Sequence, residues 1–416
     1  MKKNKIDFFY RYTMDLLSIT ENFICFKEDN CFKESIYADE VEQIGKETIY
    51  INLFNVEPIL RLPRKLVYLN CSHYDLKELP ELPDNLVYLY CYDNALKELP
   101  DLPDKLSILD FSGNESETLP ELPKNLVNLY CTDNNLKSLP DLPDSLEYLY
   151  CYGNELETLP ELPDNLLELD CSENNLKSLP ELPDNLVDLD CSYNNLKYLP
   201  DLPDNLKELN CFHNKIETLP ELPKSLLELK CSNNMLKSLP KLPDNLKKIF
   251  CLHNKIETLP YLPKSLLELK CYNNMLKSLP ELPNNLVVLD CYKNNLKYLP
   301  DLPDNLLDLN CSNNKIETLL DLPKNLKELN CSKNMLKSIL ELTNNLIKVD
   351  CSKNMLKCLP ELPDNLRNLD CSENELETLP ELPENLKTLY CSKNMVRCLP
   401  ELPDNLRNLD CSENNL

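Results

Sequence analysis

The feature that most constrains this chain is a pattern that returns every twenty residues. It is easiest to see between Leu86 and Pro103, where leucines, one cysteine, one asparagine and two Leu-Pro pairs hold fixed positions. The first regular copy begins at Leu66 and the last at Leu406, which gives eighteen copies. A fixed period of this length indicates a solenoid, in which each copy forms one coil and buries its leucines against its neighbours.

The first half of each copy alternates between inward and outward positions. In the copy that begins at Leu86, Leu89 and Cys91 are predicted to point inward and Tyr88 and Tyr90 outward, which is the period of two expected of a strand. Because identical coils stack in register, these strands are predicted to form a parallel β-sheet. Three outward positions per copy are predicted to form its concave face.

The second half of each copy turns the chain and returns it along the back. The amide of Asn94 is predicted to bond to backbone groups of its own turn and of the next copy. Leu96 and Leu99 then return to the core. Pro100 and Pro103 predict an extended, polyproline-like convex side without a helix, since proline fixes φ and removes a hydrogen-bond donor.

These residues, and above all the Leu-Pro-x-Leu-Pro signature, resemble the leucine-rich repeat family, in particular its short class found in secreted effector proteins of pathogenic bacteria. The resemblance covers about 350 of 416 residues and implies a leucine-rich repeat solenoid that binds proteins. The second inward strand position departs from the class, because it is cysteine rather than aliphatic. Some such effectors carry a C-terminal ubiquitin ligase domain with a catalytic cysteine, but the repeats here run to Leu416 and offer no residues for that activity.

Two stretches at the N-terminal side depart from the frame. Residues 1–45 show a helical spacing of apolar side chains and are predicted to form a small helical cap, with a partner-binding or secretion-related arm as the alternative. Residues 46–65 are predicted to be a degenerate first repeat, with Ile49 and Ile51 at its inward positions. Residues 66–416 are the eighteen regular repeats, and the apolar layer that ends at Leu416 makes end-to-end self-association a further alternative.

Seventeen of the 21 cysteines share one position, from Cys71 to Cys411, where Phe111 is the single replacement. Side chains in an in-register sheet run parallel, which does not suit a disulfide, and single thiols twenty residues apart do not suit a metal site. The column is therefore predicted to be buried, free thiols in a reducing compartment, the cytoplasm of the chain's own or a host cell. Cys358 and Cys398 lie two copies apart, too far for a bridge.

Composition excludes several classes of function. The net charge of -25 disfavours nucleic acid and anionic membranes as partners, and no apolar stretch is long enough to span a membrane. Three glycines leave no phosphate-binding loop, and no serine-histidine-acid set or zinc spacing is present. His73, His213 and His253 share one frame position but do not form a single site. The chain is therefore predicted not to be an enzyme and to need no cofactor or metal.

The outward strand positions carry the candidate partner-binding residues. Tyrosine supplies a large contact area and a polar tip, although strands favour aromatic residues in any case. The early copies place eight tyrosines on this face: Tyr68, Tyr88, Tyr90, Tyr92, Tyr130, Tyr148, Tyr150 and Tyr152. An acidic strip follows, which either attracts a basic partner or keeps the surface solvated: Glu168, Asp170, Asp188 and Asp190. Phe212, Phe250, Leu252 and Tyr272 are candidates for a second contact.

These observations predict a non-enzymatic scaffold that binds a protein partner, with a basic surface, on its concave face. By resemblance it would act as an intracellular effector or adaptor. Two alternatives remain open: a substrate receptor that recruits a ubiquitin ligase or another enzyme through its N-terminal segment, and a self-assembling structural repeat protein.

Overall fold

The computed structural model describes residues 50–52, 62, 64–319 and 321–416, with the backbone alone for 50–52. Two compact units divide the chain between Asn135 and Leu136. The predicted cap over residues 1–45 lies outside the described residues. Over the described ranges, no helix has the length and apolar character needed to cross a bilayer.

The first unit is a parallel sheet whose strands pair in chain order. Its strands are β1 (Tyr50–Asn52), β2 (Tyr68–Asn70), β3 (Tyr88–Tyr90), β4 (Ile108–Asp110) and β5 (Asn128–Tyr130). From β2 onward the partners are twenty residues apart, so that Leu89 lies beside Leu109. Side chains of one frame position therefore stand in columns across the sheet, as the repeat predicts.

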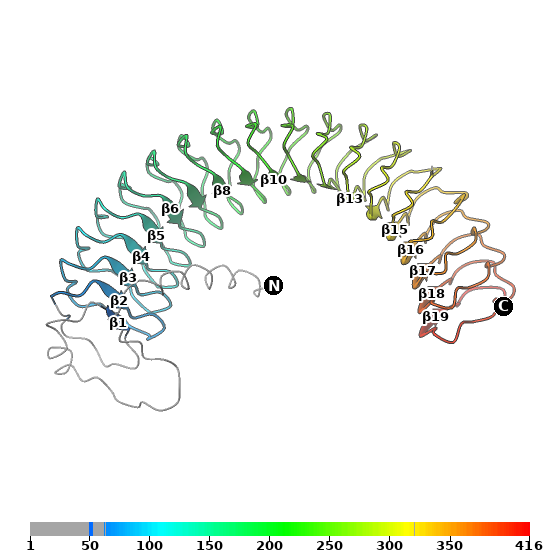
Figure 1. The fold of residues 1–416 in the computed structure, drawn as a ribbon, viewed down its shortest axis with the longest axis horizontal. Helices are drawn as coiled ribbons and strands as arrows, with labels where there is room; N and C mark the ends of the chain where they lie inside the picture. Colours follow the sequence, from blue (N-terminus) through cyan, green and yellow to red (C-terminus); the bar gives the residue numbers. More distant parts are fainter. Residues whose placement is uncertain (1–49, 53–61, 63, 320) are drawn as a thin grey trace, which may run out of the picture. The chain divides into compact units, whose positions relative to one another are not determined.

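The second unit continues the same pattern, and within it each strand pairs in parallel with the next. Its strands are β6 (Tyr148–Tyr150), β7 (Glu168–Asp170), β8 (Asp188–Asp190), β9 (Glu208–Asn210), β10 (Glu228–Lys230), β11 (Lys248–Phe250), β12 (Glu268–Lys270), β13 (Val288–Asp290), β14 (Asp308–Asn310), β15 (Glu328–Asn330), β16 (Lys348–Asp350), β17 (Asn368–Asp370), β18 (Thr388–Tyr390) and β19 (Asn408–Asp410). These strands line the inner side of the unit's curved stack (Figure 1). The prediction of a solenoid with its parallel sheet on the concave face is confirmed.

The core is the column of leucines and thiols that the repeat predicts. Leu86, Leu89, Cys91 and Leu96 have no exposed surface, and the same positions are buried in nearly every other described copy. Burial of the cysteine column is thus confirmed, and the described thiols are free. A fully buried leucine contributes about 1.5–3 kcal/mol relative to an exposed one, which makes this column the main source of stability.

The copy that begins at Leu106 replaces two of these core residues, and both replacements are fully buried. Phe111 stands in the cysteine column and Ser116 in a leucine column, each with no exposed surface. The Ser116 hydroxyl lies 2.8 Å from the carbonyl oxygen of Lys97 and 2.6 Å from that of Thr118, and its single hydrogen can be donated to either. The hydroxyl is therefore not left unsatisfied inside the core.

The convex side is extended, as the prolines predict. Throughout the described ranges, the segments between strands are turns and irregular backbone, without a helix. A tight turn closes each coil, and in one copy the Leu86 N–H donates to the Pro83 carbonyl at 3.0 Å.

The turn asparagine bonds as predicted within its own coil, but its other partners are in the preceding copy and not in the next one. Asn234 Nδ2 donates to the carbonyls of Cys231 and Ser232 at 3.2 Å and to Cys211, one copy earlier, at 2.9 Å. Its Oδ1 accepts the Ile216 N–H at 2.9 Å. Each copy thus satisfies backbone groups that the previous copy cannot satisfy itself.

The residue before the turn position, which is asparagine in every regular copy except the first, where it is Tyr74, has a positive φ in every regular copy from His73 to Glu413. This conformation favours glycine, yet glycine holds it only at Gly113 and Gly153. A Cβ at Gly113 would approach Asp93 Oδ1 to 2.2 Å, so that glycine is required unless Asp93 moves. The sequence pattern does not reveal this position, because its side chains vary from lysine to tyrosine.

The degenerate first repeat is shorter than predicted. Ile51 of β1 pairs with Leu69 of β2, a spacing of 18 residues. The predicted register, in which Ile49 and Ile51 align with Leu69 and Cys71, is therefore off by two residues.

Candidate functional site

The candidate site is the outward face of the strands. In β3 the middle residue is buried, while Tyr88 and Tyr90 on either side of it are half-buried, and most strands repeat this pattern. Each strand is only three residues long, so Tyr92 and Tyr152 lie two residues past a strand end. The predicted three outward strand residues per copy are in fact two on the strand and one on the following turn.

In the first unit three of the predicted tyrosines meet on the sheet. The ring of Tyr68 lies 6.3 Å from that of Tyr88 and 5.5 Å from that of Tyr90, between ring centroids. Burial raises the pKa of Tyr90, and the neighbouring tyrosines and Asp110 add to this shift. Such tilted aromatic pairs contribute about 0.5–1.5 kcal/mol beyond their buried area, so these rings also stabilise the sheet.

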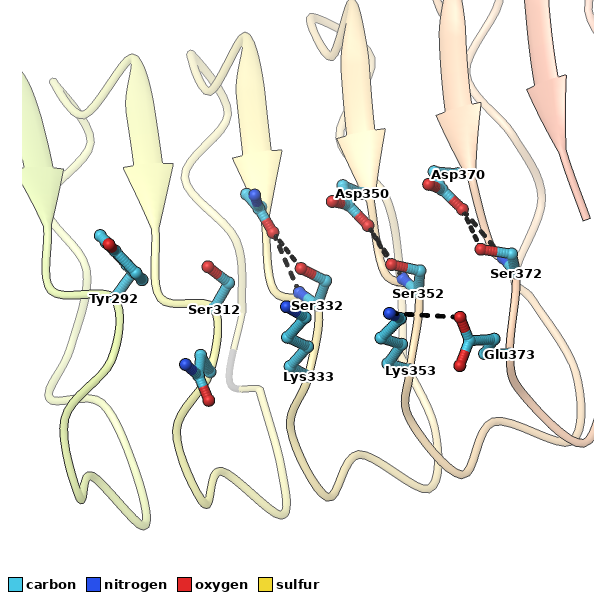
Figure 2. A pocket seen from close by; sticks show the side chains of 12 residues that line it. Tyr292, Ser312, Ser332, Lys333, Asp350, Ser352, Lys353, Asp370, Ser372 and Glu373 are labelled. Atoms are coloured by element: carbon cyan, nitrogen blue, oxygen red, sulfur yellow. Dashed lines mark hydrogen bonds and ion pairs between the residues drawn. The ribbon is translucent and has the colours of Figure 1, made fainter.

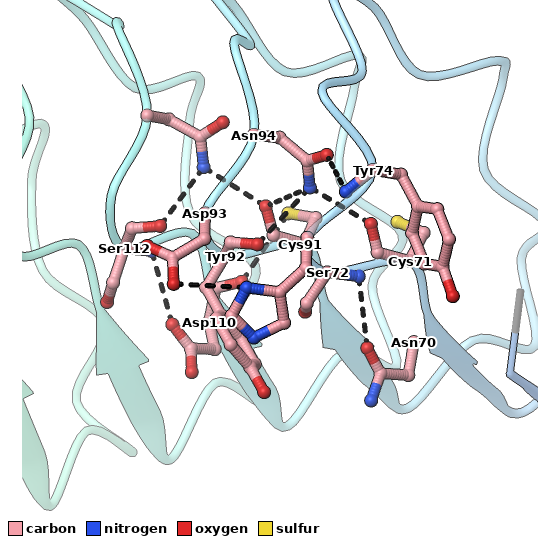
Figure 3. A network of polar contacts seen from close by, with 12 residues as sticks. Asn70, Cys71, Ser72, Tyr74, Cys91, Tyr92, Asp93, Asn94, Asp110 and Ser112 are labelled. Carbon is pink, nitrogen blue, oxygen red and sulfur yellow. Dashed lines mark hydrogen bonds and ion pairs between the residues drawn. The ribbon is translucent and has the colours of Figure 1, made fainter. Parts of the chain in front are cut away.

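Tyr92 belongs to a separate polar network beside the strands (Figure 3). Its ring packs edge-on against His73, with centroids 4.8 Å apart, and His73 Nδ1 lies 3.2 Å from Asp93 Oδ2. Asn94 joins this turn to the preceding copy by donating to the Cys71 carbonyl at 2.9 Å. Tyr92 therefore lies beside the turns that follow the strands, and not on the sheet with the other tyrosines.

The sequence analysis missed Asp110 as a candidate. It pairs in register with Tyr90 on one side and Tyr130 on the other, and its side chain is buried. Burial raises its pKa to about 6, although the Ser112 N–H, 3.1 Å from Asp110 Oδ1, opposes the shift. The signal was present, since Asp110 occupies the same frame position as the two tyrosines.

In the second unit the remaining tyrosines adjoin the acidic strip. Tyr148 pairs with Glu168 and Tyr150 with Asp170. The Tyr150 hydroxyl donates to Glu168 Oε2, and this hydrogen bond runs diagonally between the two strands. Tyr152 follows on the turn. The structure thus joins an aromatic surface to an acidic one within β6 and β7.

Three carboxylates then stand side by side. Asp188 pairs in register with Glu168 on one neighbouring strand and with Glu208 on the other, so adjacent carboxylates are about one strand spacing apart, roughly 4.8 Å. The pKa of Asp188 is raised to about 7, first by burial and then by the charges of Glu208, Glu168 and Asp190, while Lys230 opposes them. None of the three described carboxylates has an ion-pair partner, and the charge of Lys230 offsets only part of the repulsion between them.

Asp170 and Asp190 have a structural role that the sequence analysis did not foresee. Asp170 Oδ1 accepts the Ser172 N–H at 3.0 Å and the Ser172 hydroxyl at 2.6 Å. Asp190 Oδ1 binds Ser192 in the same way. These aspartates close the turn after the strand, and Asp190 Oδ2 also accepts a hydrogen bond from Asn210 Nδ2 at 2.8 Å.

The acidic strip ends at two lysines. Lys230 and Lys248 lie 2.9 and 3.2 Å from the two carboxylate oxygens of Glu228. Burial raises the pKa of Glu228, but the hydrogen bonds and charges of the two lysines outweigh it and lower the pKa. Beyond them the Lys270 ammonium lies 5.2 Å from the centre of the Phe250 ring, a cation–π contact.

Metal binding and thiol chemistry find little support in the described ranges. Among those residues no cluster of three or more histidine, cysteine, aspartate or glutamate side chains could hold a metal ion. The column thiols are poor nucleophiles, because burial raises the pKa of Cys211 and of Cys251 to about 12. The histidines lie on turns. The pKa of His253 is lowered mainly by burial and to a lesser extent by the positive charge of Lys293.

Comparison with solved structures identifies the family. YopM from Yersinia enterocolitica is similar over 100% of this chain and 96% of its own, with 37% sequence identity and a TM-score of 0.83. This chain belongs to the YopM family of bacterial leucine-rich repeat effectors. YopM from Yersinia pestis, described as a leucine-rich effector protein, is 39% identical with a TM-score of 0.67, over 73% of this chain and 88% of its own. The prediction of an effector-type leucine-rich repeat protein is confirmed.

A more distant likeness extends to receptors. The plant peptide hormone receptor RGFR1, solved in complex with RGF2, is similar over 85% of this chain and 71% of its own, with 22% identity and a TM-score of 0.60. At this identity the likeness shows the fold alone. A scan of protein-family models gives no match, and neither does a search of curated proteins.

Proposed function

We propose that this YopM-family protein is a non-enzymatic scaffold that binds a basic segment of a protein partner on the concave face of its second unit. The observation that carries the proposal is the row Glu168, Asp188 and Glu208. Three adjacent carboxylates without ion pairs cost the folded protein free energy, and a bound lysine or arginine would recover it. The neighbouring Tyr148 and Tyr150 offer aromatic surface for the same partner.

The tyrosines of the first unit are proposed as a separate contact surface of that unit. Tyr68, Tyr88 and Tyr90 already pack on one another, so they present a rigid surface that loses little entropy on binding. Tyr130 beside the buried Asp110 and Tyr92 on the turn enlarge this surface. The effector family and the burial of free thiols support a role inside a reducing compartment of a host cell or of the producing cell.

The test neutralises the acidic row without changing side-chain size. The variant Glu168→Gln/Asp188→Asn/Glu208→Gln is compared with wild type for binding of a fluorescein-labelled peptide of alternating lysine and tyrosine, by fluorescence anisotropy. We expect the affinity to fall by about tenfold or more, because about 1.4 kcal/mol of electrostatic attraction corresponds to a factor of ten.

A matched control removes three charges from the convex side of the same three copies. Glu181→Gln/Asp201→Asn/Glu221→Gln changes the net charge equally, and all three side chains are exposed. It should bind the peptide as wild type does. If both variants lose affinity to the same extent, the attraction is a general effect of net charge and the concave site is rejected.

The tyrosine surface is tested separately by changing Tyr150 and Tyr152 to Ala. These substitutions are expected to weaken capture of the peptide while the circular dichroism melt stays close to that of wild type. Tyr90 is the exception among the candidates, since its half-buried ring packs against Tyr68, and its removal should also lower stability. Unchanged peptide binding after loss of both Tyr150 and Tyr152 would remove the aromatic part of the proposal.

A further inference from the structure

One strip of the second unit, next to the strand ends, carries no carboxylate. It consists of the seventh, eighth and tenth residues of the nine copies that begin at Leu186 through Leu346, and we call it the turn strip. The chain has 69 acidic residues, and the same positions are acidic just before the strip at Glu173 and just after it at Glu373 and Glu375. Within the strip these positions hold lysine, methionine and aromatic side chains, together with serine, asparagine and one leucine.

The aromatic residues of the turn strip form two clusters. Tyr193 packs against Phe212 and His213, with ring centroids 5.1 and 4.9 Å apart, and is 46% exposed. Further along, the Tyr272 ring lies 5.4 Å from that of His253 and 4.8 Å from that of Tyr292. Exposed aromatic clusters of this kind are typical of protein contact surfaces.

Methionine thioethers continue the apolar surface between and beyond the two clusters. Met235, Met275 and Met335 are 41%, 47% and 43% exposed. Methionine is flexible and polarizable, so a row of exposed methionines adapts to apolar side chains of varied shape.

Lysine supplies the charge of the turn strip. Its six lysines are Lys215, Lys255, Lys293, Lys315, Lys333 and Lys353, all exposed. Lys353 lies 3.2 Å from Glu373, whereas Lys255, Lys293, Lys315 and Lys333 make no ion pair with any described residue. His253 adds little charge near neutral pH, because burial and then Lys293 lower its pKa.

At one end the turn strip is hollowed into a shallow pocket of about 480 Å³ (Figure 2). Lys333 and Lys353 lie on neighbouring turns of its lining, and Tyr292 closes one side. The pocket carboxylates of Asp350 and Asp370 are turned back toward the serine two residues on, and each Oδ1 accepts that serine's N–H and hydroxyl. Glu373 also lines the pocket and pairs with Lys353 at 3.2 Å, so among the described residues the Lys333 ammonium is the one that remains for a bound anion.

We propose that the turn strip is a second docking surface, which takes an acidic protein segment with apolar side chains. Charge complementarity selects the acidic groups, and the methionines and rings select the apolar ones. Single-stranded nucleic acid also combines anions with stacking bases, but its continuous phosphate chain would meet the acidic columns of the adjacent sheet, such as Asp290, Asp350 and Asp370. A protein segment can place its carboxylates at the lysines alone.

The test uses a fluorescein-labelled peptide of alternating glutamate and leucine, followed by fluorescence anisotropy with the full chain. The variant Lys293→Glu/Lys315→Glu/Lys333→Glu reverses three charges that have no ion pairs to lose. The backbone tolerates glutamate here, since Glu173 and Glu373 occupy the positive-φ position and Glu155 and Glu375 the tenth position of other copies. We expect wild type to bind the peptide and this variant to bind it about tenfold or more weakly.

The matched control is Lys207→Glu/Lys247→Glu/Lys327→Glu, three exposed lysines at the second position of their copies, before the strands. It carries the same charge change and should bind the peptide as wild type does. Equal loss in both variants, no binding by wild type, or tighter binding of an oligothymidylate than of the peptide would each overturn the proposal. If the charge reversal lowers the circular dichroism melt, the corresponding Lys→Gln set replaces it. Binding of lysine–tyrosine peptide to the acidic row should be unaffected, so the two sites are tested independently.

Discussion

The turn asparagine ladder gives the sharpest test of how the coils hold together, and Asn234→Ala removes one rung. The Ile216 N–H loses its acceptor at 2.9 Å and has no other partner among the described residues. The Cys211 carbonyl keeps a longer bond from Asn214 at 3.3 Å, so it is not left unsatisfied. An orphaned buried donor costs about 1–3 kcal/mol and the lost net hydrogen bonding about 1 kcal/mol, which together give about 2–4 kcal/mol.

The measurement is hydrogen exchange at the Ile216 amide, with urea unfolding of the whole chain beside it. Because a coil of a solenoid contacts only its neighbours, protection should fall at Ile216 and adjacent coils and persist near Leu356. The control is Asn245→Ala, an exposed asparagine whose Nδ2 donates to the Lys224 carbonyl at 3.3 Å, and we expect it to cost less than about 1 kcal/mol. If Asn234→Ala and Asn245→Ala have equal effects, the ladder does not stabilise the stack as argued.

Three further predictions follow from the structure. Phe111→Cys should lower the free energy of unfolding by about 2–4 kcal/mol through a cavity, and adding Ser116→Leu should restore much of it in a double-mutant cycle by urea unfolding. The pKa of Asp188 is raised to about 7, so the folded protein loses stability as the pH rises from about 4 toward 7 and this carboxyl must ionise. Asp188→Asn removes that cost and should stabilise the protein by roughly 2 kcal/mol at pH 7 but not at pH 3. Thermal melts of both proteins at the two pH values measure the difference. Native-state maleimide labelling with mass spectrometry should modify the exposed Cys358 and Cys398 first, and rapid labelling of the buried column would contradict its packing.

Much of the fold followed from the repeat, because each frame position has one environment in all coils. Leu89 and Cys91 are buried and the prolines keep the back extended, as predicted. The asparagine ladder was predicted with the wrong neighbour, since a pattern that is identical in every copy does not show whether a side chain reaches forward or back. The short strand spacing at Ile51 was missed because outside the regular copies the frame itself is uncertain.

Less of the candidate site than of the fold could be predicted from the sequence. The frame placed Glu168 and Asp188 on the outward face, but whether a carboxylate is available depends on local hydrogen bonds. Asp170 and Asp190 use one oxygen each to close their turns, and Glu168 accepts a hydrogen bond from the Tyr150 hydroxyl. Asp110 occupies the same frame position as Tyr90 and Tyr130 but was not predicted as a candidate. The burial of this outward carboxylate depends on how the neighbouring tyrosine rings pack, which the sequence does not show.

The order of residues alone determined that the chain forms stacked twenty-residue coils with a leucine and thiol core, because one coil is too small to bury its own apolar side chains. The tertiary structure decided how neighbouring coils use each other. Stacking in register lines up side chains that are twenty residues apart, and only this alignment makes adjacent carboxylates repel, rings cluster and Lys333 and Lys353 share a pocket. Interactions between columns depend on distances in space, which the spacing along the chain does not contain.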